Sequence, residues 1–210
     1  MRYEIDYTLY LVTDRELMST QILEEAVESA IQGGCTIVQL REKSASSLDF
    51  YQYATKVKAV TDKYKIPLII NDRVDIALAI DAAGIHVGQS DLPAEVVRRI
   101  IGRDKIVGVS ANTVEDAIKA VNAGADYIGV GALYSTNTKT DAELVSKEQL
   151  LAVRKAVNIP IVGIGGISNK NAGELVATGI DGIAVVSAII AQNDIKKAAQ
   201  ELLDIFRTKM

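Results

Sequence analysis

One pattern of hydrophobic and polar residues recurs along most of the chain. A short run rich in Val, Ile and Leu is followed by polar residues and then by an amphipathic helical segment. Most of the runs are continuously apolar rather than alternating, which is typical of parallel strands buried on both faces. The pattern predicts eight strands, at residues 9–14, 36–40, 67–72, 84–88, 105–110, 126–131, 160–165 and 182–187.

The segments between these runs have helical periodicity. Residues 22–31 place their apolar side chains on one face and Glu24, Glu25 and Glu28 on the other. Thr113 with Asp116, and Ser146 with Gln149, have the spacing of N-terminal capping boxes. The helix after the fourth strand is expected to start near Pro93 and to stop at Gly102. Other helices are predicted to end in glycine just before the next strand, at Gly33, Gly84, Gly124 and Gly179.

Eight strand–helix units in 210 residues leave about 26 residues for each unit, which is enough for a (β/α)₈ TIM barrel. The alternative is a doubly wound open sheet, which usually has five or six strands and a G-x-G-x-x-G turn after the first. Here the first strand continues into "TDRELMS" instead. Without a linker or low-complexity stretch, we expect one domain over residues 1–210.

Composition limits the partners of such a domain. The net charge of −4 does not favour nucleic acid or an anionic membrane surface, so an anionic ligand requires a local site. The longest apolar runs fall short of the ~20 residues that span a bilayer, and Glu4 and Asp6 interrupt any signal peptide. The single cysteine, Cys35, fits a reducing, cytoplasmic location and is expected to be a buried, inert thiol. The composition leaves the oligomeric state open.

In a (β/α)₈ barrel the active site lies at the C-terminal ends of the strands, so polar residues there are candidates. In "QLREK", Gln39, Arg41 and Lys43 alternate and therefore share one side of the chain. An amide, a guanidinium and an ammonium together suit a polyanion such as diphosphate. The alternative is that the strand has ended and that these charged side chains are simply exposed to solvent.

The next two strands end in further oxygen ligands. Asn71 and Asp72 follow the third strand, and Asp91 follows the fourth. Two carboxylates on neighbouring strand ends could share one Mg²⁺ with diphosphate oxygens. The alternative for Asp91 is the N-cap of the following helix. His86 lies within the fourth strand rather than at its end, which favours a packed histidine over a general base.

The last strands have the features of a phosphate site. Gly165 and Gly166 follow the seventh strand and Ser187 follows the eighth, where backbone N–H groups often bind phosphate. The alternative is that the paired glycines only form a tight turn. The stretch "STNTKTD" at 135–141 follows the sixth strand and is unusually rich in hydroxyls around one ammonium. It is either a solvated loop or a site for an anion, and its place at the barrel mouth favours the anion site.

These residues resemble one known family. The motifs "LYLVTD", "VQLREK", "LIINDRVDIALAIDAAGIHVGQSDLP", "IVGVS", "GADYIGVGALYSTNTKTD", "PIVGIGGI" and "AVVSAI" are similar to those of the thiamine-phosphate synthases, in order, from about residue 9 to 190. The resemblance implies a (β/α)₈ barrel that joins 4-amino-2-methyl-5-hydroxymethylpyrimidine diphosphate to a thiazole phosphate. It also implies release of diphosphate and a requirement for Mg²⁺.

The resemblance also assigns roles to positions. The pyrimidine diphosphate would bind Gln39, Leu40, Arg41, Glu42, Lys43, Asn71, Ser110 and Lys139. The thiazole phosphate would bind Thr136, Asn137, Thr138, Gly166, Val186 and Ser187. Asp72 and Asp91 would bind Mg²⁺, and catalysis would rest on Arg41, Lys43, Ser110 and Lys139.

Three positions depart from the family pattern. Ala132 and Ser135 stand where the family often has Pro, and Asn112 stands where it commonly has His. A sister branch, the thiazole tautomerases, shares the barrel, uses a histidine in that region and tends to lose the T-x-T-K-x-D pattern. This chain keeps the pattern and lacks the histidine, which favours the synthase. The alternatives are a tautomerase-type isomerase and a non-catalytic phosphate-binding barrel.

Overall fold

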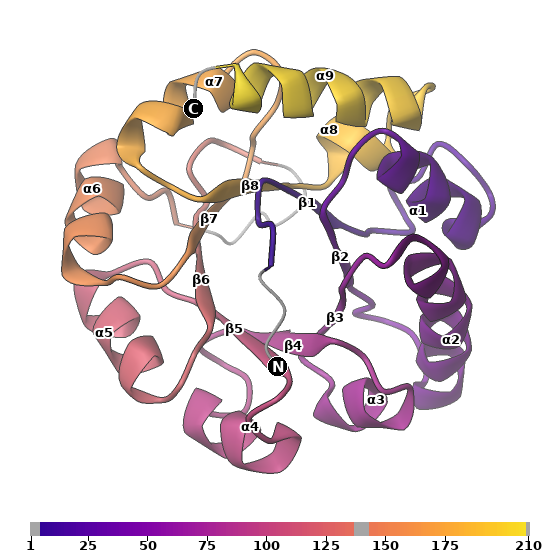
Figure 1. Cartoon of the computed structure of the whole chain (residues 1–210), viewed down its shortest axis with the longest axis horizontal. Helices are drawn as coiled ribbons and strands as arrows, with labels where there is room; N and C mark the ends of the chain where they lie inside the picture. The colour runs from indigo at the N-terminus through magenta and orange to yellow at the C-terminus, as the bar shows by residue number, and fades with distance from the viewer. Residues whose placement is uncertain (1–4, 137–142, 209–210) are drawn as a thin grey trace.

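The chain forms a closed barrel of eight parallel strands, which pair in sequence order, with helices around the outside (Figure 1). The computed structural model describes residues 5–136 and 143–208. The strands are β1 (Leu9–Val12), β2 (Ile37–Leu40), β3 (Leu68–Asn71), β4 (Gly84–Val87), β5 (Ile106–Ser110), β6 (Tyr127–Val130), β7 (Ile161–Ile164) and β8 (Gly182–Val185). Because β1 pairs with β8, the predicted barrel is confirmed and the open sheet is excluded.

Helices of very different length connect the strands. They are α1 (Leu23–Gln32), α2 (Ser47–Tyr64), α3 (Val74–Ala79), α4 (Ala94–Ile101), α5 (Val114–Asn122), α6 (Lys147–Ala156), α7 (Ala172–Leu175), the 3₁₀ turn η1 (Val176–Thr178), α8 (Ser187–Ile190) and α9 (Ile195–Arg207). No helix in the described part of the chain is long and apolar enough to cross a membrane.

The strands are continuously apolar because each one lies between two cores. In β1, Leu9 and Leu11 are fully buried in the layer between the strands and the helices. Tyr10 and Val12 point the other way and pack inside the barrel, where Tyr7 and Tyr127 join them. Period-two alternation therefore separates an outer core from an inner one, although both are hydrophobic.

The cap predictions have mixed outcomes. Ser146 and Gln149 form the complete capping box of α6. Thr113 accepts the Asp116 N–H at the start of α5, but the Asp116 carboxylate accepts from the Thr113 hydroxyl rather than from the backbone. The prediction that Gly84 ends a helix is wrong, because Gly84 is the first residue of β4. A Cβ there would lie 2.3 Å from the Ile106 carbonyl oxygen, so close strand contact requires glycine.

Cys35 has the environment that its sequence context predicted. The thiol is free, only 2% exposed, and packed in the outer core. Burial raises its pKa well above that of an exposed thiol. Because the thiolate is the reactive form, Cys35 is chemically inert in the folded protein.

Candidate active site

The polar residues predicted from strand ends β2 to β5 converge at one end of the barrel. The pairing of β2 with β3, β3 with β4 and β4 with β5 makes these four strand ends neighbours. The most compact group there comprises Lys43, Asp72 and Asp91. The Lys43 Nζ lies 2.5 Å from the Asp72 Oδ2, and Asp72 and Asp91 also interact through their side chains.

The backbone holds both carboxylates in place. Asp72 has φ of +62°, a left-handed conformation that lets the chain turn sharply after β3. Its N–H donates to the His86 carbonyl, 2.9 Å away in β4. The Asp91 Oδ2 accepts from the Gly88 N–H at 2.7 Å, whereas the N-cap of α4 is Pro93. The alternative interpretation of Asp91 as that helix N-cap is therefore wrong.

Electrostatics at this pair favour a cation. Burial is the largest cause that raises the pKa of Asp72; Lys43 opposes the rise and the nearby Asp91 adds to it. Two close carboxylates repel each other unless a positive charge compensates them. Within the described ranges no cluster of three or more His, Cys, Asp or Glu side chains could hold a metal ion. The pair nevertheless fits Mg²⁺, which commonly takes one or two carboxylates and fills its other positions with water and phosphate oxygens.

The remaining residues of "QLREK" point in different directions. The Arg41 guanidinium lies 3.4 Å from Asp14, and the Arg41 N–H donates to the Thr13 hydroxyl. Glu42 pairs with Arg15 at 2.8 Å, and Arg15 also covers the Tyr53 ring. The Leu40 side chain is fully buried in the outer core, so only its main chain is available to a ligand.

Two largely buried amides lie inside the barrel end. Gln39 is 5% exposed and its Nε2 donates to the Tyr10 hydroxyl at 2.9 Å. Asn71 is 9% exposed, and no fully buried side-chain polar atom in the described part of the chain lacks a hydrogen-bond partner. The Asn71 amide makes no side-chain hydrogen bond within those ranges, so its polar atoms are not fully buried. Its hydrogen-bonding capacity is therefore free for a ligand.

His86 is packed inside the barrel, as its position in the strand indicated. The Nδ1 lies 2.9 Å from the Tyr127 hydroxyl and the Nε2 lies 3.0 Å from the Ser110 hydroxyl. Burial lowers the pKa of His86 to about 4, so the ring is neutral at physiological pH. The hydroxyl of Ser110, which was predicted to contact the pyrimidine, is thus hydrogen-bonded to an imidazole inside the barrel.

Tyr10 and Tyr127 have no place among the sequence-predicted candidates, whereas Gln89 lies at a strand end, where polar residues were candidates. The two tyrosines lie within apolar strand runs and resemble ordinary core residues. Gln89 follows β4, and its Nε2 donates to the Ser110 carbonyl at 2.5 Å. A tyrosine inside a buried run needs a hydrogen-bond partner for its hydroxyl. This requirement is the feature of the sequence that could have indicated a polar role for Tyr10 and Tyr127.

The glycines predicted to bind a phosphate have a tightly packed backbone. Gly165 and Gly166 have φ of +95° and +66°, and a Cβ on Gly166 would lie 2.5 Å from the Ser135 carbonyl oxygen. These glycines therefore let β7 approach the start of the loop after β6. Val186 is half-buried, and Ser187 is exposed as the first residue of α8.

The loop after β6 is only partly within the described residues. Thr136 is half-buried and is the last residue before the gap. The predictions for Asn137, Thr138 and Lys139 lie outside the described residues. Asn112, where the family commonly has His, accepts the Gly131 N–H through its Oδ1 at 3.2 Å and so ties the end of β5 to the start of this loop.

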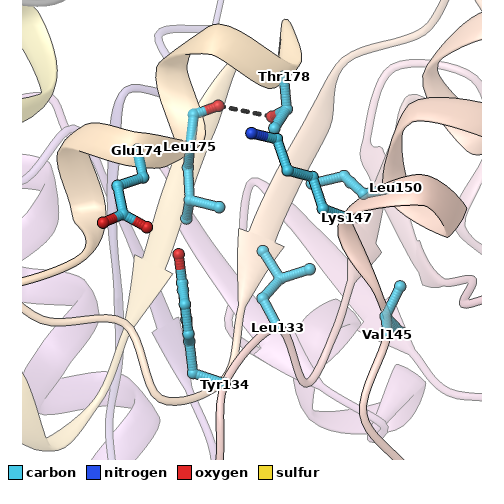
Figure 2. Close-up of a pocket in the computed structure, with 8 residues that line it drawn as sticks. All are labelled: Leu133, Tyr134, Val145, Lys147, Leu150, Glu174, Leu175 and Thr178. Atoms are coloured by element: carbon cyan, nitrogen blue, oxygen red, sulfur yellow. Dashed lines mark hydrogen bonds between the residues drawn. The ribbon is translucent and has the colours of Figure 1, made fainter.

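A separate cavity of about 180 Å³ lies beside that loop (Figure 2). Its walls come from the loop after β6, from α6 and from α7–η1, with Leu133, Leu150 and Leu175 supplying apolar surface. Leu150 and Leu175 belong to the outer core. None of the predicted site residues in the described ranges lines this cavity, which is therefore distinct from the cluster at the strand ends.

Comparison with known proteins agrees with this architecture. A family model described as thiamine monophosphate synthase matches residues 9–189. A thiamine-phosphate synthase of Ruminiclostridium cellulolyticum is 68% identical over 209 residues, covering all of both chains. One from Methanobrevibacter smithii is 54% identical over 98% of each chain. A solved thiamine phosphate pyrophosphorylase from Pyrococcus furiosus has 38% identity, a TM-score of 0.90 and 98% coverage of both chains. The chain belongs to the thiamine monophosphate synthase family.

Proposed function

We propose that this chain is a thiamine-phosphate synthase. It joins 4-amino-2-methyl-5-hydroxymethylpyrimidine diphosphate to 4-methyl-5-(2-phosphoethyl)thiazole and forms thiamine phosphate and diphosphate. The observation that carries the proposal is the match to synthases along the full chain, at up to 68% identity among the relatives described. The cationic and carboxylate groups gathered at the strand ends support it.

The chemistry requires departure of an anion. The bond between the pyrimidinylmethyl carbon and diphosphate oxygen breaks, and its electron pair leaves with diphosphate. The resulting cation is stabilised by the 4-amino group of the ring. The thiazole nitrogen then donates its lone pair to the same carbon, so one C–O bond is exchanged for one C–N bond.

Arg41, Lys43 and Lys139 would stabilise the negative charge that develops on the departing diphosphate. Preorganised cations in a partly desolvated site act more strongly than in water. Asp72 holds the Lys43 ammonium beside the strand ends, where the diphosphate is proposed to bind. Asp72 and Asp91 would hold Mg²⁺, which when bound neutralises and orients diphosphate oxygens.

The remaining residues would orient and shield the reactants. Gln39, Leu40, Glu42, Asn71 and Ser110 are proposed on the pyrimidine side, with Leu40 acting through its main chain. Thr136, Asn137, Thr138, Gly166, Val186 and Ser187 are proposed on the thiazole phosphate side. No protein nucleophile is required, because the thiazole nitrogen is itself the nucleophile; alignment and exclusion of water are the main tasks.

The decisive experiment supplies the purified protein with both substrates and Mg²⁺ and measures thiamine phosphate and diphosphate together. Formation of the two products in equal amounts is expected. A parallel sample with the thiazole substrate alone, followed by NMR, tests for isomerisation. Isomerisation without condensation would overturn the synthase assignment, and absence of both activities with demonstrated substrate binding would favour a binding barrel.

We also propose that the protein works in the cytoplasm on small-molecule substrates. A single buried free thiol is compatible with a reducing compartment. The net charge of −4 gives no general attraction to nucleic acid or anionic membrane.

A further inference from the structure

We propose that Tyr10, Tyr127 and His86 form a polarised hydrogen-bond relay through which Gln39 makes the Ser110 hydroxyl a hydrogen-bond donor to the substrate. The identity of that substrate rests on the proposed function, but the polarity of the relay does not. His86 acts in it as a positioning residue rather than as a general base.

The relay is continuous across the inside of the barrel. The Gln39 Nε2 lies 2.9 Å from the Tyr10 hydroxyl, which lies 2.8 Å from the Tyr127 hydroxyl. The Tyr127 hydroxyl lies 2.9 Å from the His86 Nδ1, and the His86 Nε2 lies 3.0 Å from the Ser110 hydroxyl. Four contacts thus join β2 to β5, and both ends of the relay are residues proposed to face the pyrimidine.

The direction of each hydrogen bond follows from the first one. The Tyr10 oxygen accepts from the Gln39 amide, so the Tyr10 hydrogen points to Tyr127. The Tyr127 hydrogen then points to the His86 Nδ1, which must be unprotonated. A neutral imidazole keeps its hydrogen on Nε2 and donates it to the Ser110 oxygen.

The hydroxyl hydrogens of Tyr10 and Tyr127 are donated within the relay. The Ser110 hydroxyl hydrogen is not, so it can be donated to a ligand in the site. Within the described ranges the Ser110 hydroxyl has one side-chain partner, the His86 Nε2, and in this direction of the relay Ser110 is the acceptor there. A donor at this position selects a substrate atom with a lone pair, such as a ring nitrogen of an aminopyrimidine. Reversal of the relay would instead present a lone pair, which suits an amino N–H. No proton is transferred in this scheme.

The barrel interior is shaped to hold the relay. A Cβ on Gly108 would lie 2.1 Å from the Tyr127 ring, and a Cβ on Gly129 would lie 3.2 Å from the His86 ring. Both glycines therefore leave space for one of the relay rings. Tyr7 packs on the Tyr127 ring with centroids 5.0 Å apart. Tyr10 and Tyr127 are each 1% exposed, so water does not compete for their hydroxyls.

The chain offers a direct readout because His86 is its only histidine. ¹⁵N-histidine labelling and NMR of the ligand-free protein report which ring nitrogen carries the hydrogen. The Nε2–H tautomer is expected in the wild type. The Nδ1–H tautomer there would overturn the proposal without any variant or substrate, and independently of whether the protein is a synthase.

Two variants test the role of Gln39. In Gln39→Glu, studied at about pH 8, a carboxylate can only accept from Tyr10, so the relay should reverse and His86 should switch to the Nδ1–H tautomer. Gln32→Glu is the matched control, since Gln32 donates to the Tyr64 hydroxyl at 3.1 Å on the outer surface. It should keep the wild-type tautomer. An unchanged tautomer in folded Gln39→Glu would show that Gln39 does not set the polarity.

A kinetic test separates positioning from general loss of structure. Tyr127→Phe breaks the relay below the site and should raise KM for the pyrimidine diphosphate about tenfold, the effect of one misdirected hydrogen bond. The KM for the thiazole phosphate should not change. Tyr64→Phe, which removes an outer hydroxyl bonded to Glu28, is the control. Equal rises in both KM values, or none, would contradict the proposal.

Discussion

At the scale of single residues, Asp72 combines a strained backbone with an unfavourable charge environment. Its φ is +62° and its carboxylate is close to that of Asp91. Such a combination costs folding free energy and persists where the surrounding structure or a ligand compensates it. Lys43 compensates part of it.

Asp72→Asn should lower kcat at least about 100-fold and weaken Mg²⁺ dependence, because it removes one proposed metal ligand. Asparagine tolerates a positive φ, so the fold should remain intact. Asp75→Asn is the control, since Asp75 forms an exposed pair with Arg73. Steady-state kinetics over a Mg²⁺ titration provide the measurement. Full activity with an unchanged Mg²⁺ requirement would remove Asp72 from the metal site.

His86 should make stability depend on pH. Its folded pKa of about 4 lies below the usual 6.5, so the unfolded chain takes up a proton first as pH falls. The free energy of unfolding should therefore decrease by about 1.5 kcal/mol between pH 6.5 and about 5. Urea unfolding at several pH values measures this slope. A His86→Gln variant should lack it; persistence of the slope there would assign it to other groups.

At the scale of elements, the contact between β7 and the loop after β6 positions residues proposed to bind the thiazole phosphate. The Leu133 and Tyr134 N–H groups donate to the carbonyls of Ile164 and Gly165. The start of the loop is thus bonded to the end of β7. This contact requires the absence of a side chain at Gly166.

Gly166→Ala should raise KM for the thiazole phosphate at least about tenfold, since the added Cβ would displace the backbone at Ser135. Gly102→Ala is a matched control. Gly102 also has a positive φ, +82°, but a Cβ added there would have no atom within 4 Å. Both variants should lose stability from backbone strain, Gly166→Ala the more because of its clash, and only Gly166→Ala should affect substrate binding. Equal kinetics in the two variants would contradict this role.

At the scale of the whole molecule, one stabilising arrangement occurs twice. Arg98 of α4 pairs with Asp126, which precedes β6 and accepts the Val107 N–H. Arg154 of α6 pairs with Asp181, which precedes β8 and accepts the Ile161 N–H. In each case a helix arginine and a carboxylate connect the N-terminal ends of two neighbouring strands, opposite the candidate active site.

Arg98→Met should destabilise the protein by about 3 kcal/mol, because both partners are largely buried and Asp126 would lose its countercharge. Arg154→Met should cost about 1 to 2 kcal/mol, since the Asp181 side chain is 43% exposed and water can replace the arginine. Chemical denaturation measures both values. Equal losses would show that burial of the pair does not determine its contribution.

The barrel and most of the residues at its strand ends could be predicted from the pattern of amino acids alone. Eight apolar runs separated by amphipathic segments leave few other ways to bury both faces of each strand. Residues at strand ends, such as Asn71–Asp72 and Ser110, can be identified as site candidates from the sequence because polar residues there have no role in the core. The prediction for Gly84 was wrong because a glycine before an apolar run has the same sequence signature whether it ends a helix or begins a strand.

Which side chains meet depends on how the strands are arranged in three dimensions. Lys43, Asp72 and Asp91 come together because β2, β3 and β4 are neighbours in the closed sheet. Tyr10 and Tyr127 are 117 positions apart, and their contact depends on barrel closure and on the space left by Gly108. Hydrophobic periodicity records which face of a strand is buried. Contact across the barrel depends on strand order, register and side-chain volume, which periodicity does not encode.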